Sequence, residues 1–175
     1  MNYHNALNIS AITALGLALS LSNAVAQQKQ HVLIKAPAEN SKYTQQQLVD
    51  VGDIPGHQVR VFEIHRTFAP NPPMINGLKL TESWTRGISD YIDNTGTSTN
   101  YTVYVLENGD KFFTRVGLVA QSVGPGKFTN STAGTITGGT GKMLGIRGIV
   151  RSSGTAEPKA GVNENQTEIE YWMEK

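Results

Sequence analysis

The sequence predicts an all-β protein whose strands form a closed or nearly closed antiparallel barrel. From Val59 to the C-terminus, β-branched and aromatic residues dominate and turn signals recur at short intervals, with no long helical pattern among them. Strands joined by hairpins pair antiparallel, and such a set must form a sandwich or close into a barrel to hide its edges. The 18 glycines suit the tight turns and strand bends that closure requires.

About seven strands follow in order from these signals. They are expected at residues 59–66, 78–93, 101–107, 111–120, 127–137, 145–152 and 167–174. Three prolines make residues 67–77 a long loop. Asn108-Gly109 is the strongest hairpin signal, because a two-residue turn of this kind needs positive φ at both positions.

The N-terminus divides the chain into three parts. Residues 1–26 read as a signal peptide, with an uncharged apolar run that ends in Ala24-Val25-Ala26. Its first residues lack Lys and Arg, so a retained membrane anchor is the alternative, although the run is short for a span of about 20 residues. Residues 27–57 are predicted to be a polar N-terminal arm and residues 58–175 the β-barrel domain. A secreted or periplasmic location follows.

Composition limits the partners. The chain has 15 Lys and Arg against 14 Asp and Glu, with no basic block that would favour nucleic acid and no basic amphipathic stretch that would favour a membrane after signal cleavage. It contains no cysteine, so its stability in an oxidising compartment must come from packing alone. Oligomeric state does not follow from the sequence.

The most distinctive segment is glycine-rich and spans residues 134–148. A phosphate-binding loop would need Gly where Ile136 stands, and Ser or Thr where Met143 stands. The dinucleotide fingerprint fails as well, because Leu144 occupies the place of its third glycine. We therefore expect a tight turn at Gly138–Gly141 and no cofactor.

The same segment resembles a family. Its Gly-Gly-Thr-Gly, followed by Ile146-Arg147-Gly148, is similar to the signature hairpin of the allene oxide cyclase and dirigent-like β-barrels. The resemblance implies a barrel of about eight strands whose lumen holds a small hydrophobic molecule. This chain has Met143 or Leu144 where that family carries Phe, and none of the cyclase catalytic residues is recognisable.

Strand parity nominates ligand-binding residues. On residues 78–93, Glu82, Arg86 and Asp90 share a face with apolar residues such as Trp84. Ionisable groups among buried positions are costly unless they pair or line a wet cavity, so they are candidate polar anchors. A bulge at Gly87 that sends Asp90 to solvent is the alternative. The candidate wall residues of the lumen are Trp84, Tyr104, Phe113 and Tyr171.

Parity also nominates catalytic residues. Glu63 and His65 share a face and project about 7 Å apart, so they could act as acid and base, although a solvated strand end is the more common arrangement. Adding His57 would suggest a metal site, but three ligands along one strand do not easily converge on a tetrahedral ion. Arg115 is either an anion clamp in the lumen or a surface charge.

Three functions remain open. The leading one is an exported module that binds an apolar or amphipathic small molecule in the barrel lumen. The second is a cofactor-free isomerase or cyclase that uses Glu63, His65, Asp90 and Arg115. The third is a structural or interaction protein whose barrel is filled by its own side chains.

Overall fold

The computed structural model describes residues 28–174, so the predicted signal peptide lies outside the described residues. The described chain consists of antiparallel strands and short 3-10 turns, which confirms the all-β prediction. The elements are β1 (Gln30–Ala36), η1 (Ala38–Asn40), β2 (Ser41–Asp50), β3 (His57–Thr67), β4 (Met74–Ile75), β5 (Leu78–Ile92), β6 (Thr95–Leu106), β7 (Lys111–Gly124), β8 (Lys127–Gly139), η2 (Gly141–Met143), β9 (Ile146–Glu157), η3 (Pro158–Ala160) and β10 (Val162–Met173).

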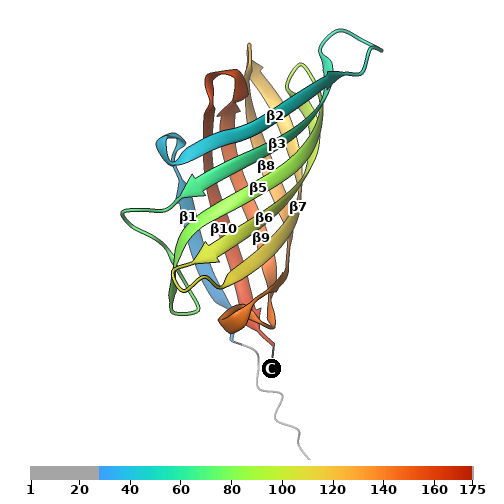
Figure 1. Ribbon diagram of the computed structural model, residues 1–175. Coiled ribbons are helices and arrows are strands. Elements are labelled where there is room, and N and C mark those ends of the chain that lie inside the picture. The colour runs from blue at the N-terminus through green and yellow to red at the C-terminus, as the bar shows by residue number, and fades with distance from the viewer. Residues whose placement is uncertain (1–27, 175) are drawn as a thin grey trace, which may run out of the picture.

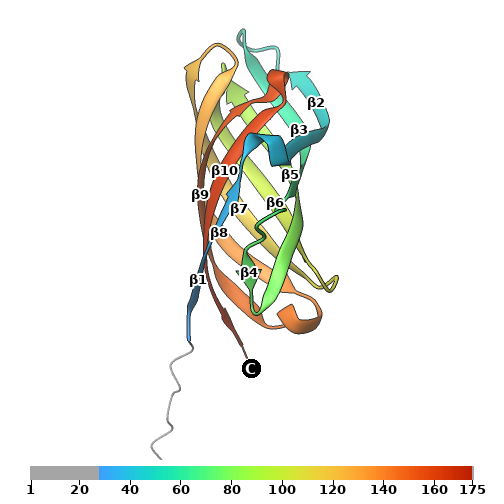
Figure 2. The same ribbon diagram turned by 90° about the vertical axis from the view of Figure 1, so that its left-hand side faces the viewer.

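The strands form one sheet in the order β1-β10-β9-β8-β7-β6-β5-β3-β2, with β4 added beside β5. Consecutive strands from β5 to β10 pair as neighbours, as hairpins require. The sheet curls into a barrel shape, seen from two sides in Figures 1 and 2. Its backbone ladder is not closed, because β1 and β2 are two edges.

Side chains bridge the seam between β2 and β10. The Asn163 amide on β10 donates to the Tyr43 hydroxyl on β2 at 3.2 Å. Its oxygen accepts a hydrogen bond of 2.7 Å from Arg66 on β3. Nearer the end of the sheet, the Gln46 amide donates to the carbonyl of Pro158 at 3.4 Å. The curled sheet is thus joined here by side-chain hydrogen bonds in place of a backbone ladder.

Residues 27–57, expected as an arm outside the sheet, supply both edge strands. On β1, Val32, Ile34 and Ala36 alternate inward and pack with the core, while Leu33 and Lys35 face out. The alternation covers only a few residues, and β2 is polar along its exposed edge. Pairing with β10 and β3 orders both segments despite their weak local pattern.

A bulge in β5 reverses the parity expected for residues 78–93. The register against β6 shifts between Leu80 and Glu82. Beyond the shift, Ser83, Thr85 and every second residue up to Tyr91 are buried. The intervening residues of β5, Glu82 included, therefore face outward. The bulge lies between Leu80 and Glu82, before the Gly87 that the sequence suggested, and it reverses the parity of the strand from Glu82 onward.

One end of the barrel is filled. The larger apolar cluster packs there and includes Leu106, Phe112 and Ile169. Ile75 from β4 and Met143 from η2 are fully buried in it and act as a plug. The Asn76 backbone N–H donates to the Tyr171 hydroxyl at 2.7 Å, which ties the plug to β10. Figure 2 shows β4 and the η2 turn at this end.

The glycine-rich segment supplies the Met143 part of this plug. The expected reversal after Thr137 is present, but it includes the η2 turn rather than a simple hairpin loop. Gly141 has φ of +52°, and a Cβ there would lie 1.9 Å from a carboxylate oxygen of Asp110. Asp110 in turn accepts the backbone N–H of Lys142 at 2.9 Å. Glycine is therefore needed so that η2 can fold against the β6–β7 loop.

Among residues 28–174, no helix has the length and apolar character needed to cross a membrane.

Candidate functional site

Above the plug, the inner face of the barrel becomes polar. Hydroxyl and amide side chains form a belt around the interior, and several bond one another, as Thr85 and Thr102 do at 2.9 Å. The buried polar members include Ser83, Thr85, Asn100, Thr102, Thr114, Asn130, Asn163 and Thr167. Buried polar groups are costly unless they are paired or hydrated, so this belt is a departure from a purely structural core.

The belt surrounds a cavity of about 80 Å³. A second cavity of about 450 Å³ lies at the open end of the barrel and forms its mouth, between the β2–β3 loop and the β7–β8 turn. Three residues line both cavities: Arg60, Tyr91 and Phe128. They lie between the two cavities, and we call them the neck.

Two arginines of β3 point inward, and no Asp or Glu is among the described residues that line the inner cavity. Arg66 donates to the Thr85 hydroxyl at 2.9 Å and to the Asn163 amide oxygen at 2.7 Å. Its Nε is buried and has no hydrogen-bond partner. Burial lowers the pKa of the Arg66 guanidinium.

Arg60 at the neck is better compensated. It is 7% exposed, and its guanidinium lies over the ring of Phe62 at 4.8 Å and over that of Tyr43 at 5.7 Å. It donates to the Gln46 side chain at 3.1 Å. Aromatic faces attract cations, so Arg60 is held in place without a carboxylate.

The neck is completed by aromatic rings. Tyr91 and Phe128 meet edge to face with their centroids 5.5 Å apart. Burial raises the pKa of Tyr91 to about 12, so its hydroxyl is protonated at neutral pH. The neck therefore offers an apolar wall, one neutral hydroxyl and one cation.

Most residues proposed from the sequence lie on the outer face instead. Glu63 pairs with Arg86 at 2.7 Å, and His65 pairs with Glu82 at 2.7 Å. The His65 ring also stacks on Trp84 at 4.1 Å. The structure thus brings these five residues together across β3 and β5, but outside the barrel rather than in its lumen. The β5 bulge explains why Glu82, Trp84 and Arg86 face outward.

The remaining catalytic candidates also face outward. Asp90 and Arg115 are exposed, and the Arg115 guanidinium lies over the exposed Tyr101 ring at 5.5 Å. None of Glu63, His65, Asp90 or Arg115 lines the inner cavity. These four side chains therefore cannot act together on a molecule held inside the barrel, contrary to the enzyme hypothesis.

The wall candidates divide between the two faces. Tyr104 is buried, lines the inner cavity and stacks on Phe112 with centroids 4.5 Å apart. Tyr171 points inward too, but it belongs to the plugged end. Phe113 faces outward, as its half-buried position between inward neighbours shows. Of the four, Tyr104 alone lines the inner cavity.

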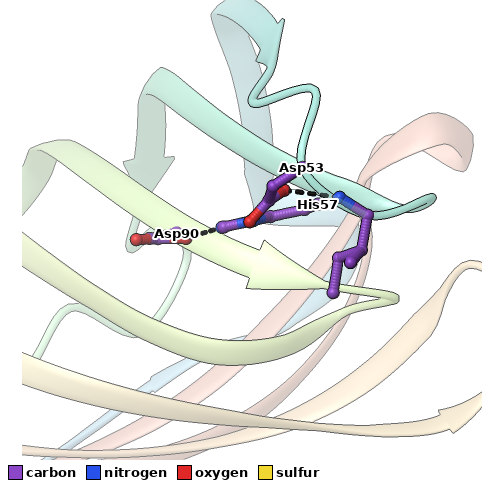
Figure 3. Close-up of polar contacts among 4 residues, drawn as sticks. Asp53, His57 and Asp90 are labelled. Carbon is purple, nitrogen blue, oxygen red and sulfur yellow. Dashed lines mark hydrogen bonds and ion pairs between the residues drawn. The ribbon is translucent and has the colours of Figure 1, made fainter.

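At the mouth, His57 is held between two carboxylates (Figure 3). Its Nδ1 lies 2.7 Å from Asp53 in the β2–β3 loop, and its Nε2 lies 2.7 Å from Asp90 on β5. Hydrogen bonds to Asp90 and Asp53 raise the pKa of His57, and the bond to His57 lowers the pKa of Asp53. When it is protonated, the imidazole donates to both carboxylates and fastens the loop to the rim of the barrel.

Within residues 28–174, no group of three or more His, Asp, Glu or Cys side chains comes together as a set of metal ligands. The sequence reasoning overlooked Arg60 and Arg66. The sequence did contain a sign that both point inward, because they lie on the same side of the strand as Phe62 and Ile64. Val59 and Val61 make the opposite side equally apolar, so alternation alone does not decide which side faces inward.

Comparison of the chain with protein-family models, with curated proteins and with solved structures finds no match.

Proposed function

We propose that this protein binds a small amphipathic molecule in its interior and carries it outside the cytoplasm. The observation that supports this most is the pair of neighbouring cavities, one at the mouth and one inside the polar belt, that share the neck residues Arg60, Tyr91 and Phe128. A barrel with a purely structural role would be expected to fill its interior with apolar side chains, as the plugged end does here.

The size of the two cavities indicates how such a ligand would lie. Typical small-molecule pockets measure about 300–1,000 Å³, a range that the mouth reaches and the inner cavity does not. The larger part of the ligand would therefore occupy the mouth, and a small polar group would enter the belt. The resemblance to allene oxide cyclase and dirigent-like barrels agrees with a guest in the lumen, and the apolar N-terminal run supports export.

The test uses 1-anilinonaphthalene-8-sulfonate, an amphipathic dye whose fluorescence rises in apolar surroundings. We expect saturable binding to the folded protein with one dominant site. Gln58→Trp, which places a bulky ring in the mouth, should weaken that binding about tenfold or more. Thermal unfolding would show that the variant remains folded.

A matched control is required because the outer face carries an exposed apolar patch formed by Val61, Ile88, Tyr101 and Val119. Ile88→Ser interrupts that patch and should leave dye binding unchanged if the site is the mouth. Loss of binding with Ile88→Ser and retention with Gln58→Trp would assign the dye to the outer surface and contradict the proposal.

A further inference from the structure

We infer that the inner cavity binds the carboxylate of its ligand at Arg66; this inference rests on the proposed function and names the chemical class of the ligand. The apolar part of that ligand would extend past Arg60 into the mouth.

The first argument is charge. Within the described chain, neither Arg66 nor Arg60 forms an ion pair with a carboxylate, whereas Arg86 and Arg147, on the outer face, both do. The inner lining holds two cations and no anion. Arg60 is buried and Arg66 is partly buried, so water screens their charges less than it does at the surface and their attraction for an anion is correspondingly stronger. The empty partner position therefore favours an anionic group.

The second argument is the geometry of the free donors. Thr85 and Asn163, both neutral, accept from the two Nη atoms of Arg66 and hold the guanidinium in one orientation. Its Nε–H remains buried without an acceptor. The Nε edge of a guanidinium matches a planar carboxylate, which accepts from Nε and from the adjacent Nη. Arg66 thus lines the cavity with its guanidinium held in one orientation and with one donor that has no acceptor among the described residues.

The third argument is the division of roles along β3. Arg60 and Arg66 are six residues apart, which corresponds to about 20 Å along a strand, so one carboxylate cannot contact both. Arg60 is already stacked on two rings at the neck. It would attract the anion during entry, and Arg66 would hold it. Thr132 and Ser152 of the belt bond each other and line the same cavity, so the lower part of the ligand would meet hydroxyl groups.

The rim of the mouth carries charges of both signs. Asp93 and Lys159 both line the mouth. Asp93 lies against Gly56, where a Cβ would approach its carboxylate to 2.2 Å, so this carboxylate is at the rim and not in the neck. The only charges below the rim among the cavity-lining residues described are therefore those of the two arginines.

The experiment compares hexanoate with hexan-1-ol, which share a chain length and differ in charge. Isothermal titration calorimetry of the wild-type protein should show that hexanoate binds about 10- to 100-fold more tightly, the range expected for hydrogen bonds to a charged group. Arg66→Gln should remove most of that difference and leave hexanol binding unchanged. Arg66→Lys should restore part of it, since it keeps the charge without the donor fork.

Arg86→Gln is the matched control, because Arg86 lies on the neighbouring strand but faces outward. It should bind both probes as the wild type does. Equal binding of hexanoate and hexanol by the wild type would overturn the carboxylate inference and leave the proposed function standing. Binding of neither probe, together with no dye binding, would count against both. If Arg66→Gln fails to fold, Arg66→Lys and the wild-type comparison decide the matter.

Discussion

At the scale of single residues, we assign two roles to Arg66, one in the seam of the barrel and one in the proposed ligand site. It joins β3 to β5 and β10 through Thr85 and Asn163, so it contributes to the seam. It also keeps one buried donor free. If Arg66 served the seam alone, a neutral side chain of similar length could replace it without changing ligand binding. The comparison of hexanoate with hexan-1-ol in Arg66→Gln therefore separates the two roles.

His57 gives the stability of the protein a predictable dependence on pH. Because its pKa is raised on folding, its contribution is fully present below the unfolded-state value of 6.5 and is lost as the pH rises through the higher folded-state value. The lowered pKa of Asp53 acts in the opposite sense, since its contribution is lost as the pH falls below 3.8. We expect the urea midpoint to decrease on the alkaline side of pH 6.5.

His57→Gln should flatten that decrease, because the charged contact to both carboxylates is gone at every pH. The measurement is urea unfolding at a series of pH values between about 5 and 9. His31→Gln serves as the control at a histidine whose side chain is 71% exposed, against 16% for His57. An unchanged pH profile in His57→Gln would show that the clamp at the rim contributes nothing to stability.

At the scale of elements, glycines set how closely the strands approach where the barrel curves. A Cβ at Gly148 on β9 would lie 2.2 Å from the carbonyl oxygen of Glu170 and 2.9 Å from the Cα of Tyr171 on β10. Gly134 is crowded in the same way by the carbonyl of Arg115, at 2.1 Å. Neither position requires a positive φ, so the need for glycine is one of space.

Gly148→Ala should therefore destabilise the protein by about 1–3 kcal/mol, because β9 and β10 must move apart. Gly117→Ala is the matched control, since it is also a strand glycine but has open space around its Cβ position. That control should be neutral or stabilising by up to about 1 kcal/mol. Equal effects in the two variants would mean that backbone entropy dominates and the close approach does not matter.

The elements also show how far the sequence predicts the fold. All seven expected strands are present, and Asn108-Gly109 does mark a hairpin, although only Gly109 of the pair has a positive φ. Among the described residues, two-residue turns with positive φ at both positions are Asn76-Gly77, between β4 and β5, and Asp93-Asn94, between β5 and β6. The parity of β5 was not predictable, because the bulge after Leu80 leaves no Gly or Pro in the sequence to mark it.

The candidate site was less accessible to sequence reasoning than the strands. Tyr104 follows from simple alternation on β6. Arg60 and Arg66 do not, because the side of β3 that faces inward depends on how the whole sheet curls. The edge strands were missed for a related reason, since β2 is stabilised mainly by its pairing with β3 and carries little apolar pattern of its own.

At the scale of the whole molecule, the seam is the place where the barrel depends on a few side chains. Asn163 is 7% exposed and connects Tyr43 to Arg66 across the gap in the ladder. Asn163→Ala should reduce the free energy of unfolding by about 1–3 kcal/mol, because the Tyr43 hydroxyl loses its hydrogen bond from Asn163 and the Arg66 guanidinium keeps only the one to Thr85. Urea unfolding measures this change.

Glu164→Ala, at the next residue, changes an exposed side chain on the same strand and should stay within about 0.5 kcal/mol of the wild type. Amide hydrogen exchange would locate the effect, with faster exchange expected in β2 and the adjoining part of β10. Exchange that increases evenly over all strands would show that the seam is no weaker than the rest of the barrel.

The two ends of the barrel differ in one further respect. The beginning of β1 and the end of β10 both lie at the plugged end, opposite the mouth (Figure 1). A linker attached at either terminus therefore leaves the mouth pointing away from its anchor. The molecule can be immobilised on a bead or displayed on a cell through these ends without obstructing access to the interior, so the proposed ligand binding can be tested on anchored protein.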